Sequence, residues 1–161
     1  MPTKGKRVWW LVGLLTVVLV LFAVSAVALS DQEPSYITEA SVLLEARGFT
    51  RSSDDLTMLH SSPGDVAVRF TGAYMDLSNG EMLADELRLG EYSWGYGGMM
   101  SSSGGRSDVW QIDAGGSDSG KSAKFAISSE VTDGEERPTF IEITAQQVTL
   151  VDRVKQWLGI R

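Results

Sequence analysis

The chain has 161 residues, a formal net charge of −7 and no cysteine, which excludes disulfide frameworks, thiolate nucleophiles and cysteine-based zinc sites. All 21 acidic residues lie at or beyond Asp31, where only 11 basic residues accompany them, so this part carries a formal charge of −10. A surface this negative repels nucleic-acid phosphates, and we expect no nucleic-acid partner. The length beyond the apolar N-terminus suits a single domain.

The N-terminal region predicts a single-pass membrane anchor. Residues 8–30 contain no charged side chain, and as a helix they would span roughly 34 Å, enough to cross the hydrocarbon layer. Basic residues precede this segment and acidic residues follow it. The positive-inside bias therefore predicts a cytoplasmic tail at residues 1–7 and a periplasmic or extracellular β domain at residues 31–161.

Two tryptophans and a small-residue motif refine this prediction. Trp9 and Trp10 would lie at the inner membrane interface, where indole rings are favoured. A cleaved signal peptide is the alternative, because Ala26-Val27-Ala28 fits the usual cleavage pattern. The uncharged core is longer than is typical of signal peptides, so we favour a retained anchor.

The first segment of the exported part, residues 35–48, is compatible with two structures. The spacing of its apolar and small residues suits a helix ended by Gly48, and the residues concerned are Ile37, Ala40, Ser41 and Leu44. Residues 42–49 could equally form a strand. We favour the strand.

A first hairpin is predicted around Asn79-Gly80. This dipeptide suits the positive φ angles of a type I′ turn, and residues 66–78 and 81–92 flank it as candidate strands. A two-residue turn would place Phe70 opposite Leu89. Substitution of Gly80 by a β-branched residue would then be costly, because such residues resist positive φ.

The next segment is rich in glycine and serine. Residues 93–108 predict a loop, residues 109–114 a short strand, and residues 115–120 another glycine-serine connection. Few apolar residues alternate here, so the only regular element expected in this stretch is the short strand.

A second hairpin is predicted from residues 121–132 and 139–151, joined through Asp133-Gly134. Its last strand repeats part of the first hairpin's apolar pattern at a spacing of 61 residues, which indicates either an internal repeat or a coincidence of two amphipathic strands. After Val151 the apolar spacing predicts a short C-terminal helix. The predicted fold class is therefore mainly β, an antiparallel β-sandwich or open jellyroll with an N-terminal transmembrane helix and a short C-terminal helix.

Residues able to perform chemistry are sparse. His60 is the single histidine, and although Asp54, Asp55 and Asp65 are near it in sequence, a catalytic zinc site needs several imidazole or thiolate ligands. No phosphate-binding glycine loop, nucleophile elbow or histidine-based triad occurs. We expect no catalytic residues, no metal and no cofactor, and hence no enzyme.

Two strand-like segments resemble the LptC and OstA-type lipopolysaccharide-export proteins. They are Glu81-Met-Leu-Ala-Asp-Glu-Leu-Arg-Leu89 and Glu142-Ile-Thr-Ala-Gln-Gln-Val-Thr-Leu150, following a basic tail and one membrane helix. The resemblance implies an open β-jellyroll that accepts acyl chains and pairs edge strands with its neighbours. The residues that would line its groove are Val66, Val68, Phe70, Leu87 and Leu89.

Two functions are compatible with these features. The first is a membrane-anchored interaction or scaffold subunit of an envelope or membrane complex, with protein partners bound through sheet edges. The alternative is a lipid or lipopolysaccharide transfer component. We favour the first, because it requires only an anchored β domain with exposed edges.

Overall fold

The computed structural model describes residues 13–18, 20, 33–52, 54–62, 64–90, 92–95, 97–118 and 121–146. Residues 33–147 form one compact unit, and the helical residues 13–18 and 20 belong to another. Within the described ranges, no helix is both long and apolar enough to cross a membrane. Most of the predicted anchor, with Trp9 and Trp10, lies outside these ranges, as does the helix predicted after Val151.

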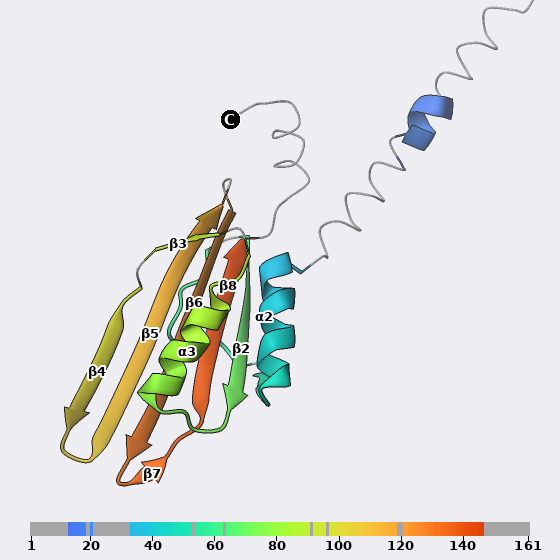
Figure 1. Ribbon diagram of the computed structural model, residues 1–161. Helices are drawn as coiled ribbons and strands as arrows, with labels where there is room; N and C mark the ends of the chain where they lie inside the picture. Colours follow the sequence, from blue (N-terminus) through green and yellow to red (C-terminus); the bar gives the residue numbers. More distant parts are fainter. Residues whose placement is uncertain are drawn as a thin grey trace, which may run out of the picture. The chain divides into compact units, whose positions relative to one another are not determined.

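The described residues of the 33–147 unit form one antiparallel sheet of eight strands and two helices (Figure 1). The helices are α2 (Ser35–Ala46) and α3 (Leu77–Leu87). The strands are β1 (Thr50–Ser52), β2 (Asp65–Gly72), β3 (Ser93–Trp94), β4 (Met99–Gly104), β5 (Ser107–Asp118), β6 (Lys121–Thr132), β7 (Glu135–Glu136) and β8 (Thr139–Gln146). Their order is β1-β2-β8-β6-β5-β3, with β4 paired to β5 and β7 paired to β6.

The prediction of a mainly β domain is confirmed. In a β-sandwich the second layer would be another sheet, but the described residues form one sheet, and the layer above it consists of α2 and α3 (Figure 1). Both helices cover the same face, where their apolar residues join those of the central strands. We call this the inner face and the opposite one the outer face.

The second predicted hairpin is confirmed as far as Gln146, and residues 147–151 of its predicted last strand lie outside the described ranges. Strands β6 and β8 pair antiparallel, with Phe125 opposite Ile143. Asp133 and Gly134 both have positive φ, 54° and 79°, as expected of the turn. The alternation on both strands directs Phe125, Ile127, Ile141 and Ile143 toward the inner face, and these two strands form the centre of the sheet.

The first predicted hairpin is wrong. Strand β2 pairs with β8, so Phe70 lies opposite Ile141 and not opposite Leu89. The chain after β2 forms α3, whose first turn contains Asn79-Gly80 and whose start is capped by Asp76, a carboxylate that accepts a 2.8 Å hydrogen bond from the Asn79 N–H. Such a cap favours a helix, and the buried residues recur with helical spacing at Gly80, Leu83, Ala84 and Leu87.

Residues 35–48 adopt the helical alternative, and the preference for a strand is wrong. One face of α2 is buried, comprising Tyr36, Ile37, Ala40 and Leu44. The helix is followed by Gly48, which has a φ of 84°. Glycine reaches this left-handed conformation without steric cost, and it commonly ends helices for that reason.

The glycine-serine segment is more regular than predicted. It contains β3 and β4, and β5 runs through residues 107–118, well beyond the predicted strand at residues 109–114. Both β3 and β4 pair with β5, and this pairing holds them as strands although their own sequences do not predict one. Glycine is needed for close approach here, because a Cβ atom on Gly97 would lie 1.2 Å from the carbonyl oxygen of Asp113.

The core between the inner face and the helices is closed. Its largest fully buried side chains include Phe70, Phe125 and Leu87. The Tyr36 hydroxyl donates a 3.0 Å hydrogen bond to the Leu87 carbonyl and so joins α2 to the end of α3. Satisfying this polar atom lets the tyrosine ring stay buried in the core.

Gly80 illustrates how tightly α3 packs on the sheet. A Cβ atom at this position would lie 2.4 Å from the ring of Trp110, which is buried and held by a 3.1 Å hydrogen bond from its indole N–H to the Met75 carbonyl. Gly80 has no positive φ, so the cost of substitution is steric and not conformational.

We expect Gly80→Ala to destabilise the domain by about 1–2 kcal/mol, because overpacking against Trp110 outweighs the helical propensity gained. Urea unfolding followed by circular dichroism measures the change. Ser78→Ala, at an exposed position in the same turn, is the control and should be close to neutral. An equal or greater stability for Gly80→Ala would contradict the close helix-sheet contact.

Candidate functional site

Strand β4 forms part of one edge of the sheet. All six of its residues are exposed, including Met99 and Met100 with exposed fractions of 46% and 67%. The strand contains no charged residue and no proline, although the domain as a whole is strongly acidic. Proteins usually protect an edge with such residues, so an edge without them is open to pairing with another strand.

The backbone of β4 alternates between groups that face β5 and groups that face away. The Asp113 N–H donates a 3.0 Å hydrogen bond to the Gly98 carbonyl, which fixes the phase of the ladder. By the alternation of antiparallel pairs, the N–H and C=O groups of Met99, Ser101 and Ser103 then point away from β5. These groups offer the hydrogen bonds that an added strand would need.

Apolar side chains accompany this free edge on the outer face. Val109 pairs with Ser102 across β4 and β5, and its side chain is 37% exposed. Met100 belongs to the same face, because paired and alternate residues share a side of the sheet. A strand lying along β4 would therefore find both backbone partners and an apolar surface beside them.

Glu142 lies at the centre of the outer face and is fully buried. Its carboxylate accepts hydrogen bonds from three consecutive backbone N–H groups, those of Thr57 at 2.6 Å, Met58 at 2.7 Å and Leu59 at 2.8 Å. The Thr57 hydroxyl donates another at 3.1 Å. Glu142 thus fastens the connection between β1 and β2 across this face.

Arg69 completes the arrangement around this carboxylate. Its Nε atom lies 3.8 Å from Glu142 Oε1, one guanidinium nitrogen donates to the Asp55 carbonyl at 3.0 Å, and the guanidinium lies 4.4 Å from the centre of the Phe140 ring. Arg69 and Glu142 carry opposite charges, and both side chains are largely buried. This is the pattern of a structural ion pair, which fixes a loop on a sheet.

A pocket of about 840 Å³ opens beside Arg69 on the outer face. His60, Asp54 and Asp55 are among the residues that line it, whereas Asp65 accepts a hydrogen bond from the Ser62 N–H. Across the described parts of the chain, no three histidine, aspartate or glutamate residues form a group able to hold a metal ion. His60 itself is exposed.

A smaller pocket of about 240 Å³ lies between the start of α2 and the turn end of β5 and β6. Its lining combines aromatic and charged side chains: Ser35, Tyr36, Glu39, Gly90, Tyr92, Asp118 and Lys121. Burial raises the pKa of the Tyr92 hydroxyl, and the carboxylates of Asp118 and Glu39 raise it further. Burial also raises the pKa of Tyr36 far above its usual range, with a smaller contribution from Tyr92.

The five residues predicted to line a lipid groove do come together, but within the closed core. Val68, Phe70 and Leu87 are buried there, and Val66 and Leu89 are partly buried against them. They meet through β2–β8 pairing and α3, not through the predicted hairpin. Whether any of them contacts lipid stays a prediction.

Sequence reasoning missed Glu142 and the β4 edge. The signal for β4 was present, since residues 99–104 are an uncharged run in an acidic chain.

No protein-family model matches the chain, and comparison with curated proteins likewise found no match.

Proposed function

We propose that the domain is an interaction module that binds a partner protein by strand addition at β4. The exposed, uncharged edge with outward N–H groups at Met99, Ser101 and Ser103 carries this proposal. In strand addition, backbone hydrogen bonds supply affinity and flanking side chains supply specificity. Met100 and Val109 are the flanking side chains on the outer face.

The charge of the domain indicates the chemistry of the partner. Because the part of the chain from Asp31 onward has a formal charge of −10, a second copy would be repelled and a basic partner would be attracted. The proposed occupant of β4 is therefore an extended segment of another protein, with lysine or arginine in or beside it. In this proposal residues 8–30 anchor the chain as a subunit of an envelope or membrane complex.

The lipid-transfer alternative has less support. A groove for acyl chains would need its lining residues to be reachable, and Phe70 and Leu87 have no exposed surface. The helices α2 and α3 cover the face on which they lie. An interaction module requires no such opening, and no catalytic residue.

The proposal is tested with Ser101→Pro, which removes an outward N–H while leaving the β4–β5 ladder in place, as edge strands tolerate. Ser101→Ala retains the N–H and is the matched control. We expect a partner that co-purifies with the full-length chain from its native membrane to be recovered about ten-fold less with proline, and normally with alanine. Quantitative mass spectrometry measures recovery.

The same complex should protect the Ser101 amide from hydrogen exchange in the wild-type chain. Equal recovery of every co-purified protein with the proline and alanine variants, at unchanged circular dichroism, would show that β4 is not the binding edge.

A further inference from the structure

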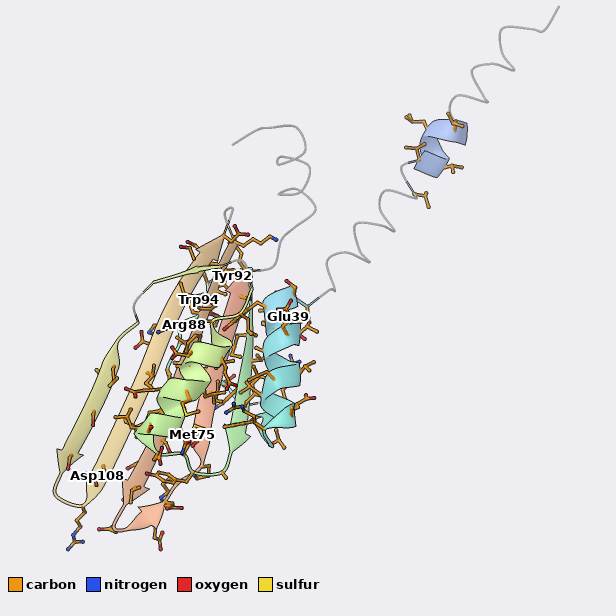
Figure 2. The ribbon with its side chains drawn as sticks, viewed as in Figure 1. Glu39, Met75, Arg88, Tyr92, Trp94 and Asp108 are labelled. Carbon is orange, nitrogen blue, oxygen red and sulfur yellow. The ribbon has the colours of Figure 1, made fainter. Side chains whose placement is uncertain are left out.

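The pocket at the start of α2 is bounded on one side by aromatic rings. Tyr36 contacts both Tyr92 and Trp94, with ring centres 5.6 and 5.4 Å apart, and Tyr92 and Trp94 lie 5.8 Å from each other. Figure 2 shows Tyr92 and Trp94 at the end of the sheet where α2 begins, and Glu39 on that helix. The Tyr36 hydroxyl donates a hydrogen bond to the Leu87 carbonyl, which ties this part of the wall to the end of α3.

Three charged side chains surround this wall. Glu39 and Lys121 are exposed residues that also line the pocket, and Asp118 lies opposite Lys121 in the β5–β6 register. The lining thus contains two carboxylates and one ammonium, a formal charge of −1. Burial is the main cause of the raised pKa of Tyr92, and the carboxylates of Asp118 and Glu39 raise it further, because negative charge beside a phenol disfavours its ionised form.

Aromatic faces combined with carboxylates are the usual means by which proteins recognise organic cations, since the rings attract the cation and exclude water while the carboxylates balance its charge. The volume of about 240 Å³ is several times that of a water molecule, which occupies about 30 Å³. An ammonium or guanidinium head with part of its alkyl chain therefore fits.

We propose that this pocket binds an organic cation of the alkylammonium or guanidinium class, with Glu39 and Asp118 as counter-charges and Tyr92 as the aromatic wall. The cation is either a free polyamine or a lysine or arginine side chain of a protein, and the two share the same chemistry. The proposal rests on a different part of the domain from β4 and does not depend on strand addition.

The test uses the full-length chain in maltoside micelles, which carry no cationic head group. The probes are spermidine, the peptide acetyl-Ala-Arg-Ala-amide and its citrulline analogue, which matches arginine in shape but has no charge. Binding is followed through the indole N–H resonance of Trp94, whose hydrogen bond to the Leu89 carbonyl places it against the cluster. Trp94→Phe assigns this resonance among those of the five tryptophans.

We expect a saturable shift with spermidine or the arginine peptide and none with the citrulline peptide. Tighter binding of spermidine would identify a free polyamine as the ligand, and tighter binding of the peptide would identify a protein side chain. Equal shifts with arginine and citrulline, or no shift with either cation, would overturn the proposal.

Two substitutions in the pocket give an independent check, because they should change the affinity for the cation in opposite directions. Glu39→Gln should weaken binding by about three-fold, and Lys121→Met should strengthen it by a similar factor, as one partly exposed charge is removed in each case. Glu45→Gln, an exposed position later on the same helix, makes the same charge change away from the pocket and should have no effect. Weaker cation binding by Lys121→Met would mean that the pocket takes an anion instead.

Discussion

Replacing Glu142 with alanine is expected to lower the free energy of unfolding by about 3–5 kcal/mol, the usual cost of removing one partner from a buried ion pair. The change leaves the N–H groups of Thr57, Met58 and Leu59 without their acceptor and Arg69 without its counter-charge. These partly buried groups would lose the hydrogen bonds that replace those they would make with water. Urea unfolding of the full-length chain, followed by circular dichroism, measures the loss.

Glu136→Ala is the matched control, because it removes the same charge from an exposed position on β7 and should change stability by less than about 0.5 kcal/mol. Glu142→Gln should lie between the two, since one carboxylate oxygen is replaced by a donor that faces other donors. A loss below about 1 kcal/mol for Glu142→Ala would show that the connection between β1 and β2 does not depend on this carboxylate.

The second large effect concerns Phe70→Asp. Phe70 has no exposed surface and lies opposite Ile141 in the closed core, so the substitution buries an unpaired charge. Because a domain's whole stability is usually about 5–15 kcal/mol, we expect the variant to be unfolded at room temperature. Circular dichroism and the loss of a cooperative urea transition report this directly.

Ala67→Asp controls for the charge itself. Ala67 is an exposed residue of the same strand on the outer face, and its variant should fold normally. A folded Phe70→Asp chain that had lost crosslinking to membrane lipid would instead favour the groove implied by the lipopolysaccharide-export resemblance. An unfolded chain agrees with the closed core and removes that reason for preferring lipid transfer.

The sequence predicted elements well where local and long-range signals agreed. The β6–β8 hairpin combines an Asp-Gly turn with apolar alternation on both strands, and it forms as expected. At Asn79-Gly80 two local signals competed, a turn dipeptide and the Asp76 cap, and the cap together with burial of Leu83 and Leu87 on the inner face decided the outcome. Tertiary packing thus overrode the stronger short-range motif.

Other features depend on contacts that no local pattern contains. Strand β4 has little apolar alternation of its own and is ordered by pairing with β5. Glu142 meets Thr57, a residue 85 positions away, and an acidic residue within an apolar strand carries no sign of which backbone groups it will bind. Once residues 99–104 are known to form a strand, their lack of charge identifies them as an open edge. The role of Glu142 can be recognised only from the folded structure.

The insertion of β2 between β1 and β8 has a consequence for folding during synthesis. The inner face that α2 and α3 cover is completed only when β8, at residues 139–146, has left the ribosome. Until then the apolar sides of both helices have no finished sheet to cover, and loop closure over some 70 residues must precede β2–β8 pairing. We therefore expect nascent copies to expose these apolar surfaces, and to be prone to aggregation, until β8 has emerged.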